Sequence, residues 1–402
     1  MKELLTLDDL GDIAGARAFV RVDFNVPLED GRVVDDTRLV EALPTLGELA
    51  ERGARLVLAS HCGRPKGRPD PRFSLRPVAE RLAELLDRPV RFAPDSVGDE
   101  VEALVAKLEP GETCLLENLR FHAGETANDP GFADRLAALG DVFVGDAFGT
   151  VHRAHASVVG VAERLERRAA GRLVEREVAA LGRLLEDPEQ PFVVILGGAK
   201  IEGKLDTIEH LLPRIDRLLL GGGMANTFLV ARGNDLGDSL VDRERVGLAA
   251  DLLERAAAAG VEVLLPTDLV IAEEPAAREE PRAVPPSEVP AGARALDVGP
   301  ATRAAFIDAF ADARTLFWNG PLGVFETPPF DRGTEVVAHA LAQLGRRGAY
   351  TVLGGGETVA AAVRAGVTDA IGHVSTGGGA SLELLAGKTL PGLAVLERPA
   401  GG

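Results

Sequence analysis

Cationic side chains recur just after predicted strands in the first half of the chain, in a pattern suited to binding a small anion. Strand ends of a parallel sheet gather at one edge, so residues distant in sequence can meet there. The planar guanidinium of arginine suits carboxylate and phosphate groups. Asp23 and Asn25, beside the first of these strands, could accept hydrogen bonds from a substrate hydroxyl. The cationic positions are Arg21, Arg38, His61, Arg64, Arg120, His152 and Arg153.

The second half of the chain carries glycine clusters after four of its predicted strands. A glycine turn at a strand end lets the backbone approach a phosphate, and the following helix offers free N–H groups. One such turn is weak evidence, because tight strand-to-helix turns need glycine in any case. Four of them favour a nucleotide. The clusters are Gly197–Gly198, Gly221–Gly223, Gly354–Gly356 and Gly377–Gly379.

Two lysines follow the first glycine cluster. From Gly198 the chain nearly matches the phosphate-binding pattern G-x-x-x-x-G-K-[ST], but Leu205 stands where a magnesium-binding hydroxyl is required, so the match fails. Lys200 and Lys204 remain, four residues apart and therefore on one face if a helix starts here. On an exposed helix such a pair means little, whereas beside glycine turns it suits phosphates.

Carboxylates that could hold magnesium should lie near the same strand ends. Glu357 directly follows the third glycine cluster and is the best candidate. Glu357 or Thr358 could instead cap a helix, and the sequence leaves both alternatives open. Glu326 is a candidate for the hydroxyls of a ribose. One half of the chain thus suits a small anion and the other a nucleotide, and a reaction that joins the two ligands needs both.

Short apolar, β-branched runs alternate with helical patterns, and this alternation predicts an α/β fold. Strands that are apolar throughout indicate parallel sheets covered on both faces. We expect two doubly wound, Rossmann-like lobes joined by a hinge helix. That helix is predicted from the apolar spacing of Leu173–Leu185, and Pro188 and Pro191 follow it. The predicted strands are Phe19–Val22, Leu56–Ala59, Thr113–Leu116, Val142–Val144, Phe192–Leu196, Arg217–Leu220, Val261–Leu265, Thr315–Trp318, Tyr350–Leu353 and Ile371–Val374.

The overall composition narrows the function classes. The formal net charge of −18 disfavours nucleic acid and anionic membranes as partners, so an anionic ligand must be held by a few placed cations. Neither a secretory signal nor a run of about twenty apolar residues is visible, which favours a cytoplasmic protein without a membrane span. Two cysteines, Cys62 and Cys114, lack metal-ligand spacing and are interpreted as reduced thiols. A Pro-rich patch at Pro275–Pro290 is interpreted as a loop inserted between strands.

Nine segments occur in the order found in one known family. They are Arg21–Pro27, His61–Gly67, Leu116–Phe121, Asp146–Ser157, Gly197–Lys200, Gly221–Asn226, Trp318–Pro321, Gly354–Gly356 and Ser375–Glu383. On these segments the sequence resembles phosphoglycerate kinase over its whole length. The resemblance implies reversible phosphoryl transfer between ATP and 3-phosphoglycerate, giving ADP and 1,3-bisphosphoglycerate, in glycolysis. It also implies magnesium with the nucleotide, no tightly bound organic cofactor, and a monomer.

The resemblance also implies a role for individual residues. Arg38 and Lys200 would flank the transferring phosphoryl group, and the amides of Gly377–Gly379 would face it. The phosphoglycerate residues would be Asp23, Asn25, Arg38, His61, Cys62, Gly63, Arg64, Arg120 and Arg153. The nucleotide residues would be Lys204, Ala295, Glu326, Gly355, Gly356, Glu357 and Thr358, with Glu357 at the metal.

The predicted helix and the prolines after it place the boundary between the lobes near residues 160–190, and the resemblance implies that the C-terminal segment returns to the first lobe. Residues 1–170, with a C-terminal segment of about 385–402 packed back onto them, would bind phosphoglycerate. Residues 171–190 would form the interdomain helix and linker, and residues 191–384 the nucleotide-binding lobe. Closure of the lobes about the helix would exclude water from the reaction.

Two positions depart from the family pattern, and two other functions stay open. Glu357 stands where the family usually has aspartate, which changes the expected magnesium geometry, and Cys62 replaces a leucine. A nicotinamide dehydrogenase would share the fold, but no segment fits its G-x-G-x-x-G turn with a later acidic residue. A non-catalytic two-lobed binding protein is the second alternative, motivated by Glu357.

Overall fold

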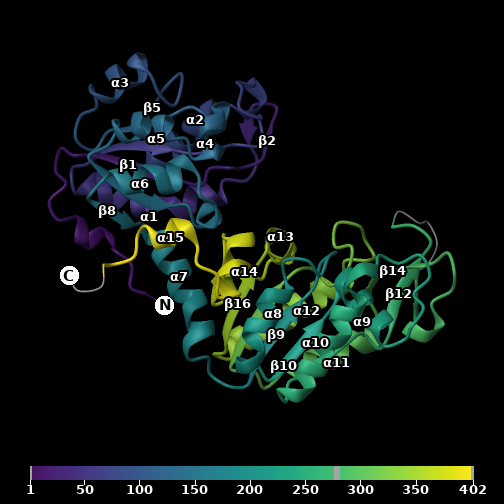
Figure 1. Cartoon of the computed structure of the whole chain (residues 1–402). Coiled ribbons are helices and arrows are strands. Elements are labelled where there is room, and N and C mark those ends of the chain that lie inside the picture. The colour runs from purple at the N-terminus through teal and green to yellow at the C-terminus, as the bar shows by residue number, and fades with distance from the viewer. Residues whose placement is uncertain (1, 276–280, 400–402) are drawn as a thin grey trace. The chain divides into compact units, whose positions relative to one another are not determined.

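The computed structural model describes residues 2–275 and 281–399 of the chain. The chain divides into two compact units, Met1–Ala179 with Thr389–Gly402, and Ala180–Lys388. Each unit contains a six-stranded parallel sheet covered by helices (Figure 1). The predicted α/β class with two parallel sheets is therefore confirmed.

The sheet of the first unit has the strand order β5-β6-β4-β1-β7-β8. All residues of β1 except Arg17 are buried, Arg21 among them, as expected for a strand covered on both faces. Two edge strands, β5 and β8, were missed, since each is three residues long and one of the three is an arginine. The strands are β1 Arg17–Val22, β4 Arg55–Ala59, β5 Val90–Phe92, β6 Thr113–Leu115, β7 Val142–Asp146 and β8 Arg168–Ala170.

Short helices cover this sheet and a small hairpin extends beyond it. The core under helices α1 and α2 is built mainly from leucine, valine and alanine, with Phe24 among its buried residues. The helices are α1 Thr37–Glu51, α2 Arg76–Leu86, α3 Asp99–Val105, α4 Ala123–Ala127, α5 Pro130–Ala137 and α6 Val161–Arg164, and the hairpin pairs β2 Leu28–Glu29 with β3 Arg32–Val33.

Two segments connect the units. Helix α7, Arg172–Glu186, begins in the first unit and ends in the second, just before Asp187 and Pro188. Its extent agrees with the helical spacing of the sequence. The chain returns to the first unit at Thr389 and forms α15, Pro391–Ala394. There the backbone N–H of Leu5 donates to the carbonyl of Leu396 at 2.8 Å, which fastens both chain ends to one unit.

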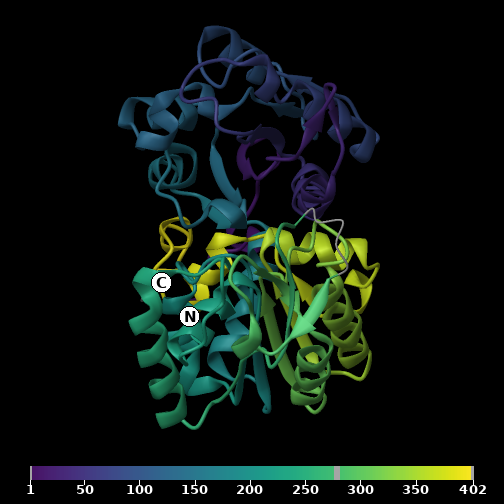
Figure 2. The same cartoon turned by 90° about the vertical axis from the view of Figure 1, so that its right-hand side faces the viewer.

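The second unit has a parallel sheet in the order β11-β10-β9-β15-β16-β17, with helices on both faces (Figure 2). The expected strands are all present, some of them shorter or longer by one or two residues. They are β9 Phe192–Leu196, β10 Arg217–Leu220, β11 Glu262–Leu264, β15 Thr315–Asn319, β16 Tyr350–Gly354 and β17 His373–Val374. The helices are α8 Leu205–Leu211, α9 Gly222–Ala231, α10 Val246–Ala258, α11 Pro300–Phe310, α12 Arg332–Arg346, α13 Gly356–Arg364 and α14 Gly379–Leu385.

A three-stranded antiparallel sheet in the second unit was not expected from the sequence. Its order is β13-β12-β14, with β12 Leu269–Ala272, β13 Arg282–Val284 and β14 Arg294–Val298. The Pro-rich patch at Pro275–Pro290, expected as a plain loop, contains β13 and a 3₁₀ turn, Pro286–Glu288. Prolines obscure a three-residue edge strand, and residues 276–280 of the patch lie outside the described residues. Among the helices that the structure describes, none is long and apolar enough to cross a membrane.

Candidate active site

A cleft of about 460 Å³ lies at the carboxyl edge of the first unit's sheet. The sequence predicted three of the residues that line it, Arg64, Arg120 and Arg153, from their places after β4, β6 and β7. The structure therefore brings together guanidinium groups that are up to ninety positions apart in the chain. The sequence analysis missed three further cationic or titratable residues of the lining, Lys66, His122 and His155.

A second group of predicted residues is joined by contacts around the end of β1. Arg38 donates to the carboxylate of Asp23, and His61 Nδ1 lies 3.7 Å from the same carboxylate. The Arg21 guanidinium contacts His61 Nδ1 at 3.2 Å and donates from Nε to Ser157 Oγ at 2.8 Å. Arg21 is only 1% exposed, so its contacts are with the protein, whereas Arg38 is half-buried.

Two side chains, those of Asn25 and Arg120, bind the backbone of the segment that follows β4. Asn25 Oδ1 accepts a hydrogen bond from Gly63 N–H at 2.8 Å, and Arg120 donates to the Gly63 carbonyl at 2.7 Å. Gly63 has φ +58°, and a Cβ there would lie 2.3 Å from the Phe73 ring, so glycine is required. Cys62 is buried, and burial raises the pKa of its thiol to about 11, which makes the thiol inert.

The cationic cluster contains carboxylates of its own. Glu125 on α4 is completely buried and accepts hydrogen bonds from Ser157 Oγ at 2.7 Å and Ser157 N–H at 3.1 Å. Burial and the neighbouring Arg153 and Arg21 lower the pKa of Arg120 to about 10, while Glu125 and Asp23 oppose that shift. No sequence signal marks Glu125, because a single acidic residue in a short helix is usually a surface group.

His61 and His155 are neutral at pH 7. Burial, and after it the Arg21 guanidinium, lowers the pKa of His155 to about 4. The same two causes place the pKa of His61 well below its usual value. These two rings therefore add no positive charge near the cleft, where Arg64, Lys66, Arg120 and Arg153 are cationic.

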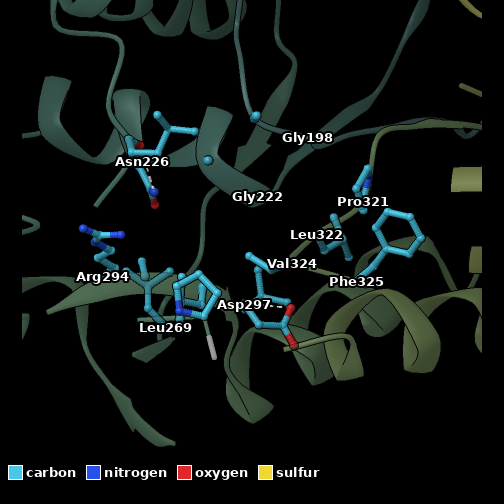
Figure 3. Close-up of a pocket in the computed structure, with 18 of the residues that line it drawn as sticks. Gly198, Gly222, Asn226, Leu269, Arg294, Asp297, Pro321, Leu322, Val324 and Phe325 are labelled. Atoms are coloured by element: carbon cyan, nitrogen blue, oxygen red, sulfur yellow. Dashed lines mark hydrogen bonds between the residues drawn. The ribbon is translucent and has the colours of Figure 1, made fainter. Parts of the chain in front are cut away.

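The second unit has a cleft of about 300 Å³, shown in Figure 3. Its lining combines the glycine turns after β9 and β10 with residues of β14 and of the loop after β15. Ala295, Glu326 and Glu357, predicted as nucleotide residues, all line it. Residues that sequence reasoning missed include Asn226, Leu240, Arg294 and Asp297.

The two lysines after β9 lie in different settings. The helix on which they would share a face does not start there, because residues 201–204 form turns and α8 begins at Leu205. Lys200 is exposed, whereas Lys204 is partly buried and donates its ammonium to the carbonyl of Gly197. Burial lowers the pKa of Lys204 to about 8, against the opposing effect of Glu357.

The third glycine cluster brings Glu357 to the cleft. Gly355, with φ +86°, precedes α13, and Gly356 is its first residue. Thr358 is buried and accepts a hydrogen bond from Gly320 N–H at 2.6 Å, which ties α13 to the loop after β15. Neither of the two capping interpretations is observed, since no side chain caps α13, and Glu357 remains exposed in the first turn.

The fourth cluster precedes α14. Gly378 precedes the helix with φ +52°, and the N–H of Gly377 donates to Ser375 Oγ at 3.1 Å. Gly377 and Gly378 are not among the residues that line either described cleft. The Gly377 amide, expected to face a phosphoryl group, has an acceptor within the protein in this structure.

A magnesium ion in the second unit would need phosphate oxygens of a bound nucleotide in addition to the protein's own carboxylate. No group of three or more His, Cys, Asp or Glu side chains in the described part of the chain could hold a metal ion. Glu357 is a single exposed carboxylate at the cleft. Magnesium is commonly held by one or two carboxylates together with substrate phosphates, so this arrangement is compatible with a metal-bound nucleotide.

Comparison with known proteins gives one consistent family. The family model described as phosphoglycerate kinase matches residues 7–388. A phosphoglycerate kinase from Thermus thermophilus is 57% identical over 398 residues, covering 99% of this chain and 100% of the relative. One from Chlorobium limicola is 51% identical over 393 residues, covering 98% of this chain and 99% of the relative.

Solved structures agree. The structure of phosphoglycerate kinase from Coxiella burnetii has a TM-score of 0.86 at 40% identity, covering 98% of this chain and 99% of that one. That from Pyrococcus horikoshii has a TM-score of 0.85 at 32% identity, covering 98% of each chain. Neither the dehydrogenase nor the binding-protein alternative receives support from these matches. The chain belongs to the phosphoglycerate kinase family, glycolytic enzymes that transfer a phosphoryl group between a nucleotide and a carboxyl group.

Proposed function

We propose that the chain catalyses reversible phosphoryl transfer between ATP and 3-phosphoglycerate, giving ADP and 1,3-bisphosphoglycerate, in glycolysis. The observation that carries the proposal is the gathering of Arg64, Arg120 and Arg153 around one cleft of about 460 Å³ in the first unit. In a chain of net charge −18, such a cluster serves a small polyanion. The family resemblance supports a monomer that works in the cytoplasm.

The first unit binds phosphoglycerate in this proposal. Arg64, Arg120 and Arg153 hold its anionic groups, and Arg38, Asp23 and Asn25 lie beside them to fix the hydroxyl and carboxylate ends. His61 holds Arg21 and Asp23 in place as a neutral ring. Cys62 and Gly63 act through a backbone that Asn25 and Arg120 fasten.

The second unit binds the nucleotide. Lys204 and the backbone at Gly355, Gly356 and Thr358 serve the phosphates, while Ala295 and Glu326 contact the nucleoside. Glu357 would hold magnesium together with oxygens of the nucleotide, and a bound ion would supply positive charge to the phosphates.

In the transfer step, the phosphoryl group passes directly from one substrate to the other, and no protein side chain forms a covalent bond with it. The acceptor carboxylate is already ionised at neutral pH, so no general base is required. One carboxylate oxygen forms a bond to the γ-phosphorus as the bond to the bridging oxygen of ADP breaks. Lys200, exposed on its loop, and Arg38 balance the charge of the transferring group, and the Gly377 and Gly378 amides join them after Gly377 exchanges its Ser375 partner.

The two ligand sites lie in separate units, and therefore we propose that the units close on each other during turnover. Helix α7 is continuous from the first unit into the second, which suits it to guide such a motion. Closure would remove water from the transferring phosphoryl group and so suppress ATP hydrolysis.

A coupled assay tests the proposal directly. The chain is given Mg-ATP and 3-phosphoglycerate, and 1,3-bisphosphoglycerate is measured through its reduction with NADH. We expect turnover that requires both substrates. A matched pair of variants locates the acceptor site: Arg120→Ala should raise the KM for 3-phosphoglycerate about tenfold or more, and Arg282→Ala, an exposed residue of β13, should not. ADP release without the acid, or no turnover with it, would contradict the proposal.

A further inference from the structure

Arg294 is the one lysine or arginine among the described residues that line the cleft of the second unit. It lies on β14 next to Ala295, where its backbone is in register with Ala272 of β12, and its exposed guanidinium makes no hydrogen bond or ion pair with another described residue. The cleft's other charged residues are acidic: Asp297, Glu326 and Glu357. An unpaired guanidinium in an otherwise acidic lining is a donor group that awaits an acceptor.

The position of Arg294 within the cleft indicates which part of a nucleotide it meets. The phosphate end is marked by the Lys204 ammonium, which would lie 2.9 Å from a Cβ placed on Gly198. Figure 3 shows Gly198 and Pro321 on one side of the cleft and Arg294 on the other, near Asn226 and Leu269. A nucleotide with its phosphates beside Lys204 would therefore extend its base toward Arg294.

The described residues around Arg294 provide apolar surface on which the flat face of a purine base can stack. They provide no group that distinguishes one purine from another by hydrogen bonds. Leu240 lines the cleft although it is 54% exposed, and Leu269 and Leu296 add apolar surface. Exposed apolar surface of this kind stacks on any base. The polar neighbour Asn226 already donates its amide N–H to the Leu240 carbonyl at 3.1 Å.

We infer that Arg294 recognises the N7/O6 edge of guanine, so that the chain uses guanosine as well as adenosine triphosphate as phosphoryl donor. Guanine presents O6 and N7 as adjacent acceptors, which match the two parallel donors of a guanidinium. Adenine presents N7 beside an amino group, which is itself a donor and cannot accept from arginine. The inference rests on the proposed nucleotide site; the transfer step is unchanged, with GDP leaving in place of ADP.

The test compares nucleotides in the Arg294→Met variant, which keeps the bulk of the side chain without its donors. kcat/KM is measured for Mg-ATP, Mg-GTP and Mg-ITP at saturating 3-phosphoglycerate. We expect the GTP value to fall about fivefold or more relative to the ATP value. ITP shares O6 and N7 with GTP but lacks the 2-amino group, so its value should fall with that of GTP. 7-Deaza-GTP, without N7, should be a poor donor for the unchanged protein and lose little more in the variant.

Arg282→Met is the matched control. Arg282 is an exposed arginine of the same three-stranded sheet, on β13, and does not line the cleft. Its replacement should leave the ratio of GTP to ATP efficiency unchanged.

Two results would overturn the inference while leaving the proposed function intact. An unchanged GTP-to-ATP ratio in Arg294→Met would show that the guanidinium does not read the base. Equal losses with ATP and GTP would place it at the phosphates or the ribose. Absence of turnover with every nucleotide in the unchanged protein would instead defeat the proposed function. Because the side chain of Arg294 has no partner among the described residues, its replacement should not alter the melting temperature, and a melt of each variant checks this.

Discussion

The carboxylate of Asp146, the last residue of β7, accepts a hydrogen bond from the backbone N–H of Leu173, in the first turn of α7, at 3.0 Å. The same oxygen lies 3.4 Å from the N–H of Val174. A Cβ on Gly171 would lie 2.3 Å from this oxygen, so glycine leaves the room that the contact needs. The sheet of the first unit thus fixes the start of the helix that continues into the second.

Loss of this contact should destabilise the first unit. Asp146→Ala leaves the first-turn N–H groups of α7 without their acceptor, and we expect a loss of about 2 kcal/mol in the free energy of unfolding. Asp146→Asn keeps an acceptor oxygen and should lie within about 1 kcal/mol of the unchanged protein at pH 7. Urea unfolding measures both. Equal losses in the two variants would show that charge, and not the hydrogen bond, is what matters.

The pH dependence of stability should carry the signature of the same residue. Burial raises the pKa of Asp146 to about 6, so between about pH 4 and about pH 6 the folded state keeps a proton that the unfolded state has lost. This group therefore lowers the free energy of unfolding as the pH rises through that range, and adds no slope above it. Urea titrations of Asp146→Asn should lack this contribution, and an identical pH slope would contradict the assignment.

Lys204 predicts how nucleotide binding changes with pH. Because burial lowers its pKa to about 8, the ammonium loses its proton above that pH and its attraction for phosphate with it. The KM for Mg-ATP should rise above about pH 8, by at most about tenfold per pH unit. Lys204→Arg, whose side chain stays charged, should show a flat profile over the same range. A rise of equal slope in both proteins would assign the effect to another group.

Replacement of Lys200 should affect the transfer step and leave substrate binding nearly unchanged. Lys200→Ala should lower kcat by about 100-fold or more, since the lost charge acts on the transferring group, with both KM values within about threefold. Lys107→Ala, an exposed lysine of the first unit, is the control and should retain normal turnover. A kcat of Lys200→Ala within a few-fold of normal would reject the role.

Glu357 tests the metal site. Removing its charge in Glu357→Gln should raise the magnesium concentration needed for half-maximal activity about tenfold, because the remaining ligands are phosphates and water. Glu357→Asp keeps the charge on a shorter arm and should show a smaller shift. Magnesium titration at fixed ATP distinguishes the two. An unchanged requirement in Glu357→Gln would mean that the carboxylate does not hold the ion.

The sequence predicted those parts of the fold that depend on long apolar runs. β9 and β10 have their predicted bounds because runs of five and three consecutive apolar residues, the second preceded by Arg217, leave a clear signal. β13 and β8 are three residues long, flanked by prolines or charges, and their pairing depends on neighbours distant in sequence.

The site was predictable to a similar degree. Residues carried by strand ends, such as Arg120 and Arg153, were found because parallel sheets gather those ends at one edge. Glu125 and Arg294 were missed, since only the folded chain shows that the first is buried beneath cations and the second faces a cleft. The sequence pattern also could not predict that α8 begins at Leu205, because glycine at position 203 permits either a helix or a turn.

The pairing of Arg38 with Asp23 bears on how long a bound acid remains. In the proposed acceptor site, the Arg38 guanidinium would return to the Asp23 carboxylate when the ligand departs, so that no unpaired cation would be left behind. Dissociation of the acid would therefore cost less electrostatic free energy than dissociation from an arginine that has no neighbouring carboxylate. Under the proposed reversible reaction, quick release of either acid would matter as much as its capture.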